Sequence, residues 1–245
     1  MNNKKLVRLP QNFFDRQLRE ELIAEFTRLD ISKVKDRMQK ATEHMAREWK
    51  YLNGKSDING FYSHTDGYVF ELEDWHIADK MKQAGMIIIG SQARGKRFLE
   101  YGCGIADTSL IASLADAEKV DALDLPSVTL DYARFRSRKF QLKTPVNFIE
   151  SVDDISKLVL PKENYDVISA EDVFEHVSDP VAHAQKIYGA LRDGGSMYFS
   201  TEFVHSDFHP MHLKSNEKLH GIEWLYELEK IGYNIVSPCR AVKKN

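Results

Sequence analysis

From Lys96 onward, short apolar runs alternate with amphipathic stretches, and this alternation constrains the fold more than any other feature of the chain. The apolar runs are typical of buried strands and occupy residues 97–101, 119–124, 145–150, 165–170, 195–203 and 233–242. The stretches between them have helical spacing and occupy residues 105–115, 127–140, 180–192 and 215–231. Strands that alternate with helices predict a parallel sheet built from right-handed crossovers. We therefore expect an α/β fold with a doubly wound, mostly parallel sheet.

The segment before Lys96 has a different pattern, which predicts a helical extension. Between residues 11 and 52, apolar residues recur three or four positions apart, as on one face of a helix. Residues 53–68 are rich in Gly, Asn, Asp and Ser and are predicted as a loop, and a further helix is expected over about 73–89. The chain is thus expected to divide into a helical cap or lid over residues 1–95 and a ligand-binding domain over residues 96–245.

Composition argues against several classes of partner. The 245 residues carry a formal net charge of −3, so no overall field attracts nucleic acid or an anionic membrane. The sequence shows neither an apolar run of membrane-spanning length nor a signal peptide. Its two cysteines, Cys103 and Cys239, have no metal-site or disulfide spacing. We expect a cytoplasmic protein that binds a small-molecule substrate, without membrane or nucleic-acid partners; a homodimer stays open.

The sequence FLEYGCGIADTSL, from Phe98 to Leu110, joins the first strand of the sheet to its helix through two glycines. Gly102 and Gly104 lie where ligands bind in doubly wound sheets, and glycine there permits positive φ and a close approach of the ligand to the backbone. A dinucleotide fingerprint requires a third glycine at the position of Asp107, where a carboxylate competes with pyrophosphate for the helix amides. The turn therefore predicts a nucleoside ligand without phosphates.

Two carboxylates near the turn indicate which nucleoside this is. Glu100, two residues before Gly102, is placed to accept a hydrogen bond from an ammonium group. Asp124 ends the next strand, 20 residues after Gly104, where a carboxylate can hold both hydroxyls of a ribose. An unphosphorylated ribose with a cationic amino-acid tail describes S-adenosylmethionine.

In this order and spacing, the motifs from Lys96 to about Val242 resemble the class I S-adenosylmethionine-dependent methyltransferase family. The residues that match its first two motifs are Glu100, Gly102, Gly104 and Asp124, with Ala106 in place of a third glycine. The segments YDVISAEDVFEHVSDP and ALRDGGSMYFST are similar to its fourth strand and to its turn into the fifth. The resemblance implies a Rossmann-like sheet of the seven-stranded type and S-adenosylmethionine as cofactor.

The resemblance also implies which residues contact the cofactor. Around the glycine turn and the second strand, they are Glu100, Gly102, Cys103, Gly104, Asp124 and Leu125. After the third strand, Asp153 is the candidate for the adenine amine, although it lies one position later than the family's acid. At the end of the fourth strand, the candidates are Ala170 and Glu171.

A second group of polar residues follows the fourth strand. Asp172, Glu175 and His176 have the spacing i, i+3, i+4, so in a helix they share one face, toward the ligand crevice. The segment HSDFHPMHL supplies further histidines after the fifth strand, among them His209 and His212. Histidines beside carboxylates suit either proton transfer or a divalent metal.

Two interpretations of this group stay open. In the first, His176 or His212 is the general base that removes a proton from an acceptor hydroxyl. In the second, the chain is similar to subgroups of the family that hold a divalent ion with an acid-x-x-Glu-His motif and a later histidine. That resemblance implies Asp172, Glu175, His176 and His212 as metal ligands, with His209 as the substitute for His212.

The acceptor is not identified by any motif. A histidine and carboxylate cluster suits deprotonation of a hydroxyl, so we expect O-methylation of a small, natural-product-like molecule. The alternatives are N-methylation of a small molecule, a peptide or RNA, and a non-catalytic subunit that only binds S-adenosylmethionine. A nicotinamide-dependent dehydrogenase is disfavoured by Asp107 at the third-glycine position.

Overall fold

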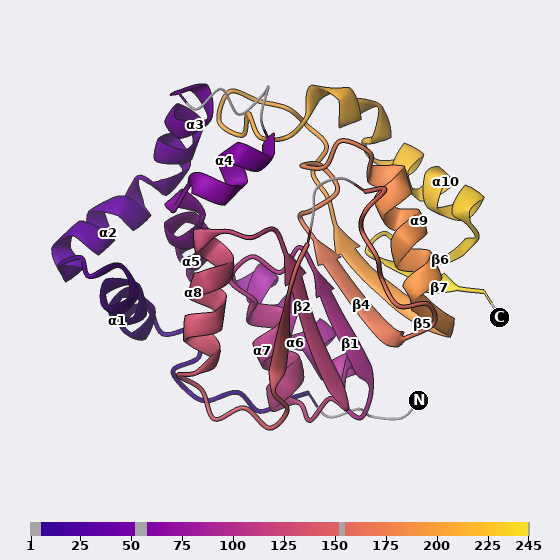
Figure 1. Cartoon of the computed structure of the whole chain (residues 1–245), viewed down its shortest axis with the longest axis horizontal. Coiled ribbons are helices and arrows are strands. Elements are labelled where there is room, and N and C mark those ends of the chain that lie inside the picture. The colour runs from indigo at the N-terminus through magenta and orange to yellow at the C-terminus, as the bar shows by residue number, and fades with distance from the viewer. Residues whose placement is uncertain (1–5, 52–57, 152–154, 245) are drawn as a thin grey trace.

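The strands form one sheet with the expected α/β architecture. In the computed structural model, which describes residues 6–51, 58–151 and 155–244, the strand order is β3-β2-β1-β4-β5-β7-β6. The strands are β1 (Arg97–Tyr101), β2 (Lys119–Asp124), β3 (Val146–Glu150), β4 (Tyr165–Glu171), β5 (Leu191–Ser200), β6 (Tyr233–Ser237) and β7 (Arg240–Lys243). The first five in this order are parallel, and β7 is antiparallel to both of its neighbours (Figure 1). The predicted doubly wound, mostly parallel sheet is confirmed.

Helices precede the sheet and cover both of its faces. Before β1 come α1 (Arg16–Thr27), α2 (Ile31–Gln39), α3 (Ala41–Tyr51), α4 (Ile58–His64), α5 (Gly67–Ala78) and α6 (Lys80–Gln92). Between and after the parallel strands lie α7 (Asp107–Leu114), α8 (Val128–Ser137), α9 (Pro180–Ala190), a 3-10 helix (Lys214–Leu219) and α10 (Ile222–Ile231). The N-terminal helical extension of the fold prediction is therefore present.

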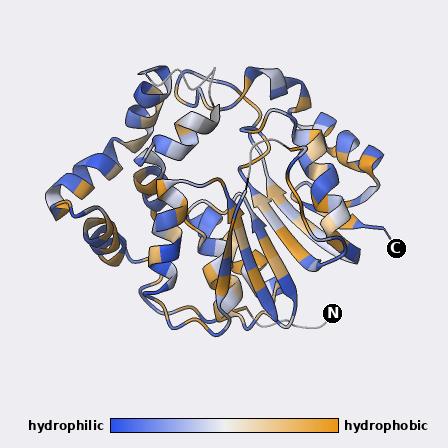
Figure 2. Cartoon of the chain, viewed as in Figure 1, coloured by the Kyte–Doolittle hydropathy of each residue, from blue (hydrophilic) through white to orange (hydrophobic). Residues whose placement is uncertain are grey.

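The core lies in two layers, one on each face of the sheet. On one face, α9 and α10 pack against β4, with Ile168, Ile187 and Leu228 buried together. On the other face, α6 and α7 pack against β1, with Ile89, Phe98 and Ala112 buried together. Figure 2 shows the apolar residues concentrated along the strands and the hydrophilic residues on the outer sides of the helices.

Two parts of the predicted secondary structure are corrected. The loop expected over residues 53–68 contains α4 and the start of α5, and residues 52–57 lie outside the described part of the chain. The single strand expected over residues 233–242 is a hairpin of β6 and β7, which pair antiparallel. Pro238 lies in the turn between them, and because proline has no backbone N–H, it interrupts a strand.

Two of the N-terminal helices, α1 and α6, begin at aspartates whose side chains accept hydrogen bonds from backbone amides of the first turn. Asp15 precedes α1 and accepts from the Leu18 amide at 2.9 Å. Asp79 precedes α6 and accepts from the amides of Met81 and Lys82 at 2.8 and 3.0 Å. Such caps satisfy donors that a helix leaves without an internal partner. The end of α5 and the beginning of α6 are therefore defined by Asp79, which fixes where Lys82 lies.

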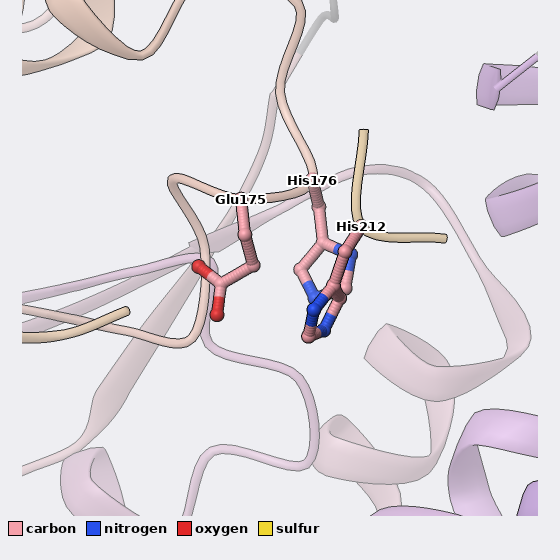
Figure 3. Close-up of side chains that lie close together, drawn as sticks. All are labelled: Glu175, His176 and His212. Atoms are coloured by element: carbon pink, nitrogen blue, oxygen red, sulfur yellow. The ribbon is translucent and has the colours of Figure 1, made fainter. Parts of the chain in front are cut away.

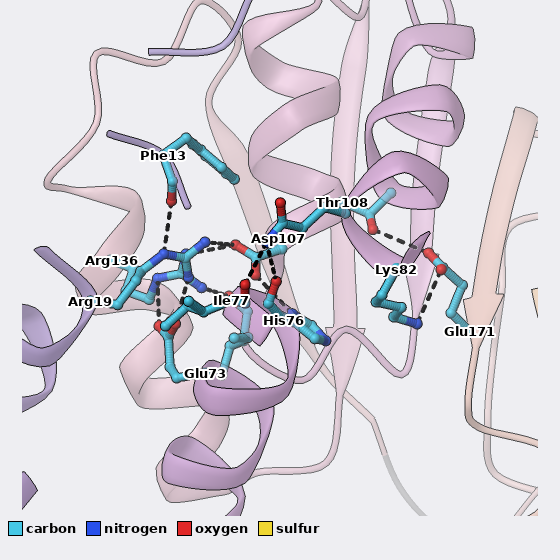
Figure 4. A network of polar contacts seen from close by, with 12 residues as sticks. Phe13, Arg19, Glu73, His76, Ile77, Lys82, Asp107, Thr108, Arg136 and Glu171 are labelled. Atoms are coloured by element: carbon cyan, nitrogen blue, oxygen red, sulfur yellow. Dashed lines mark hydrogen bonds and ion pairs between the residues drawn. The ribbon is translucent and has the colours of Figure 1, made fainter. Parts of the chain in front are cut away.

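A buried network of ion pairs joins the N-terminal helices to the sheet domain (Figure 4). Arg19 of α1 donates to Glu73 of α5 at 2.7 Å and to Asp107 of α7 at 2.8 Å. Arg136 of α8 also donates to Asp107, at 2.6 Å, and the His76 ring contacts the other oxygen of Asp107 at 2.8 Å. The side chains of Arg19, Glu73, Asp107 and Arg136 are fully buried. The carboxylate at the third-glycine position thus pairs with two arginines, which hold its pKa well below the usual range.

Candidate active site

A cavity of about 940 Å³ lies at the carboxyl ends of β1, β2 and β4. Its volume is in the range of small-molecule sites, roughly 300–1,000 Å³. Residues that follow these three strands form one wall, and residues of α2, α3 and α5 form the opposite wall. Because β1 lies between β2 and β4, this is the reversal point of the sheet, where doubly wound folds bind ligands.

The glycine turn at the end of β1 has the conformation that the sequence predicts. Gly102, Gly104 and Ala106 have φ values of 70°, 50° and 62°, all in the left-handed region. A Cβ at Gly102 would lie 2.4 Å from Cγ2 of Val173, closer than side-chain atoms approach one another. Glycine is required here for both reasons, and the turn opens directly onto the cavity.

Asp124 lies at the end of β2, on the wall of the cavity, as expected. Its carboxylate accepts hydrogen bonds from the backbone amides of Gly104 at 2.6 Å and Leu125 at 2.7 Å. These bonds fix both oxygens beside the glycine turn and leave each with a further lone pair for a ligand hydroxyl. Burial raises the pKa of Asp124. A ligand that donates hydrogen bonds to the carboxylate would lower this pKa again.

Glu100 is buried below the turn and lines the cavity. One of its oxygens accepts a hydrogen bond from the Ser109 amide in the first turn of α7, at 2.7 Å. Burial raises the pKa of Glu100 to about 8, with nearby Glu171 adding to the effect. Glu100 therefore supports the start of α7, and its contact with a cofactor ammonium stays a prediction.

The other expected cofactor residues have different positions. Cys103 and Leu125 line the cavity, whereas Ala170 is completely buried in the core and is not among the residues that line it. Asp153 lies outside the described residues. Glu171 lines the cavity and accepts hydrogen bonds from Thr108 at 3.2 Å and from Ser169 at 3.0 Å.

Lys82 of α6, which the sequence reasoning missed, binds both carboxylates at the end of β4 (Figure 4 shows its contact with Glu171). Its ammonium lies 3.1 Å from Glu171 and 2.6 Å from Asp172, and these carboxylates raise its pKa. Asp172 also accepts from the Ser200 hydroxyl at 3.0 Å, and Lys82 holds the pKa of Asp172 below its usual value. The Asp172 carboxylate is thus engaged by Lys82 and is not part of the group formed by Glu175, His176 and His212, so its role as a metal ligand stays a prediction.

Glu175, His176 and His212 lie together, as Figure 3 shows. One ligand atom from each falls within 4.8 Å of the others, and the two imidazole rings are 4.9 Å apart between centroids. The segment after β4 is a turn rather than the expected helix, and it starts with a positive φ of 54° at Asp172. The Asn216 side chain donates to the carbonyl of Val177 at 2.9 Å, which ties this turn to the segment that carries His212.

Backbone carbonyls orient both imidazoles. Nδ1 of His176 lies 3.3 Å from the Met211 carbonyl, and Nδ1 of His212 lies 3.0 Å from the Val204 carbonyl. Because a carbonyl only accepts, hydrogen on Nδ1 of His212 satisfies its contact and leaves the lone pair on Nε2. Nδ1 of His176 also lies 2.9 Å from the Tyr62 hydroxyl, which can donate or accept, so each tautomer of His176 satisfies one of its contacts. One oxygen of Glu175 accepts from the Glu202 amide at 3.0 Å, while its buried Oε2 has no hydrogen-bond partner among the described residues.

Burial governs the protonation of this group. It lowers the pKa of His176 to about 3, and it lowers the pKa of His212 as well. It raises the pKa of Glu175 to about 8, with Asp172 adding to the effect. At neutral pH both imidazoles are therefore neutral, and each has a ring nitrogen with a lone pair.

Tyr62, Tyr68 and Glu71 bring the N-terminal helices to the same space. The Tyr62 hydroxyl lies 2.9 Å from Nδ1 of His176. The Tyr68 hydroxyl donates a hydrogen bond to the Tyr62 hydroxyl at 3.3 Å. All three side chains line the cavity. The sequence signals the tyrosines by placing aromatic residues in a polar segment, but nothing in the local pattern distinguishes Glu71.

Comparisons with known proteins agree with this geometry. The family model of a methyltransferase domain matches residues 75–238. A ubiquinone biosynthesis O-methyltransferase of Vibrio cholerae is 32% identical over 108 residues, 44% of this chain and 42% of that protein. A malonyl-[acyl-carrier protein] O-methyltransferase of Paenibacillus sp. is 28% identical over 157 residues, 61% of this chain and 55% of that protein. The chain thus spans about half the length of these curated relatives.

The fold is shared with a solved structure. An S-adenosylmethionine-dependent methyltransferase from Mesorhizobium loti aligns with a TM-score of 0.50 and 19% identity, over 65% of this chain and 84% of that one. In the described part of this chain, every helix is too short or too polar to cross a membrane. With the sheet order, the glycine turn and the family match together, the chain belongs to the S-adenosylmethionine-dependent methyltransferases of the class I fold.

Proposed function

We propose that the protein transfers the methyl group of S-adenosylmethionine to a hydroxyl of a small molecule. The observation that carries this proposal is that neutral His176 and His212 lie in the same cavity as the glycine turn and Asp124. Methyl transfer from a sulfonium needs an acceptor lone pair in line with the S–CH3 bond, and a hydroxyl must also lose its proton. Both relatives named above are O-methyltransferases by name, which supports oxygen as the acceptor atom.

The sheet order suggests how the cofactor lies. Asp124 at β2 takes the ribose hydroxyls, and the amino-acid tail passes the turn at Gly102 toward β4. Two strand spacings separate β2 from β4, about 10 Å, which suits the length from the ribose to the end of the tail. At that end, the tail meets Glu171 and Lys82.

In the proposed reaction, the acceptor hydroxyl lies beside Nε2 of His176 or His212 and gives its proton to that nitrogen. The Val204 carbonyl keeps the His212 ring in the tautomer whose Nε2 accepts, so no rearrangement precedes a transfer to His212. The N-terminal helices cover the cavity and exclude water, which would otherwise hydrate the acceptor oxygen.

A divalent cation is the second candidate for this cluster. The Glu175 Oε2 atom has no partner among the described residues, and two imidazole lone pairs face the same space, so Glu175, His176 and His212 fit such an ion. Mixed carboxylate and imidazole sets suit Mn²⁺, Fe²⁺ or Zn²⁺. When bound, the ion would supply Lewis-acid chemistry that lowers the pKa of a coordinated hydroxyl.

The proposed reaction is tested by incubating the protein and methyl-deuterated S-adenosylmethionine with a small-molecule extract of its source cells. We expect S-adenosylhomocysteine together with a product that carries one labelled methoxy group, identified by mass and by its carbon NMR shift. The matched control is Asp124→Ala, which should form little of either product. A label found on nitrogen or carbon would contradict O-methylation. Binding of the cofactor without any transfer would favour the non-catalytic subunit.

A further inference from the structure

The cavity is strongly acidic. Among the described residues that line it are nine carboxylates and two lysines: Glu43, Glu71, Asp74, Glu100, Asp124, Glu171, Asp172, Glu175 and Glu202 against Lys40 and Lys82. Glu100 and Glu175, whose pKa values burial raises to about 8, are largely protonated at neutral pH, but the other carboxylates still outnumber the lysines. Such an excess of one charge sets the potential inside a cleft with low-dielectric walls. It favours cationic ligands and disfavours phosphates and carboxylates.

Both lysines already pair with carboxylates. Lys82 binds Glu171 and Asp172, and its side chain is only 12% exposed. Lys40 pairs with Asp36 on its own helical surface. An anionic acceptor would therefore find no unengaged lysine on the described part of the cavity wall.

Glu71, like Glu43, Glu100, Asp124 and Glu175, has no ion pair among the described residues, whereas Asp74, Glu171, Asp172 and Glu202 each have one. The side chain of Glu71 makes a hydrogen bond with Thr42. It lies within electrostatic reach of Tyr62 and Tyr68, whose hydroxyls have raised pKa values in part because of Glu71. Burial raises the pKa of Glu71 to about 7, so its charged form lacks compensation until a cation arrives.

The two tyrosines pack against each other and line the same cavity as Glu71. Their ring centroids are 5.2 Å apart, with 33° between the ring planes. The face of a tyrosine ring attracts an ammonium group within about 6 Å, and a carboxylate beside it adds a charge-assisted hydrogen bond. A carboxylate together with aromatic ring faces is therefore a suitable binding site for a protonated amine.

We propose that the methyl acceptor carries a protonated amine, which Glu71, Tyr62 and Tyr68 hold while a separate hydroxyl faces the histidines. This inference rests on the methyl-transfer function proposed above and adds the charge of the substrate. One substrate molecule can reach both the tyrosines and the histidines, because the Tyr62 hydroxyl lies 2.9 Å from the His176 ring. An amine seated on Tyr62 therefore leaves the rest of the molecule beside the proton acceptor.

The test compares three probes of matched shape: phenethylamine (a cation), 2-phenylethanol (neutral) and phenylacetate (an anion). Each is titrated by ligand-observed NMR into the full-length protein saturated with S-adenosylhomocysteine, at a pH above the value of about 7 for Glu71. Phenethylamine should bind at least about tenfold more tightly than the other two, as expected for one charge-assisted contact. In Glu71→Gln this preference should disappear, because the amide keeps the shape without the charge. In Glu43→Gln, which alters an exposed carboxylate of the same cavity, the preference should persist.

Three results would overturn the inference: equal or tighter binding of 2-phenylethanol or phenylacetate, an ammonium preference that survives in Glu71→Gln, or no binding of any probe. The reaction itself is judged separately, by labelled methyl transfer. Methyl transfer without an ammonium preference removes the amine site alone. An ammonium preference without transfer to oxygen removes the proposed reaction alone.

Discussion

Arg19→Met is expected to lower the free energy of unfolding by about 3–5 kcal/mol, the range for breaking a buried ion pair. Arg19 is completely buried and donates to Glu73 and Asp107 from a different part of the chain. Methionine fills much of the same volume but carries no charge. The buried carboxylates of Glu73 and Asp107 would then share Arg136 as their one arginine partner among the described residues. Urea unfolding, followed by circular dichroism, measures the loss.

The control for this variant is Arg16→Met in the same helix. Arg16 pairs with Asp74 on the surface, with 48% of its side chain exposed. Exposed ion pairs contribute about 0–1 kcal/mol, so this variant should unfold at nearly the urea concentration of the unaltered protein. Equal, small losses in both variants would show that the buried network does not join the helical extension to the sheet domain.

His176→Ala is expected to lower kcat by about 10²–10⁴-fold, the usual contribution of a general base. The affinity for S-adenosylhomocysteine should change little, because we propose that the cofactor binds at the glycine turn and Asp124. Single-turnover kinetics with the identified acceptor measures the chemical step. His220→Ala is the control: its ring is 57% exposed and is not among the residues that line the cavity, so kcat should stay within about twofold.

Chelator treatment separates the two roles of this histidine. If His176 acts as a base by itself, the unaltered protein should turn over at the same rate before and after dialysis against a chelator. If Glu175, His176 and His212 hold a cation, dialysis should remove activity and added Mn²⁺ or Zn²⁺ should restore it. Full activity in His176→Ala under both conditions would contradict each role.

The sheet domain could be predicted because its signals are local. Each parallel strand is a short apolar run, and the glycines at 102 and 104 must have positive φ wherever this turn occurs. The acid at Asp124 follows from its place at the end of the next strand. These features depend on neighbours in the chain, so their spacing indicated both the sheet and the cofactor side of the cavity.

The polar contacts of the helical extension could not be predicted in the same way. Lys82 and Glu171 are 89 residues apart, and Arg19 and Asp107 are 88 residues apart. No periodic pattern specifies such pairs, which depend on how the extension packs against the sheet. The sequence placed Asp172 with the histidines because it does not indicate how the extension that carries Lys82, the partner of Asp172, is oriented.

Turn geometry accounts for the remaining errors. The spacing of Asp172, Glu175 and His176 fits a helical face, yet the segment is a turn held by contacts with the segment near His212 and Asn216. Glu175 and His176 reach the cavity nonetheless, because the turn lies at the end of β4. Three of the four expected residues therefore lie close together, and their roles in catalysis or metal binding stay predictions.

The most direct test of this account is calorimetric titration of S-adenosylhomocysteine into the protein and into Asp124→Ala. The account predicts one site in the unaltered protein and a loss of about 1–3 kcal/mol in Asp124→Ala, the cost of removing a buried hydrogen-bond partner of the ribose. Asp131→Ala, at an exposed carboxylate of the nearby helix α8, should bind as the unaltered protein does. Equal affinity in Asp124→Ala and in the unaltered protein would contradict the placement of the cofactor at the carboxyl ends of β1 and β2.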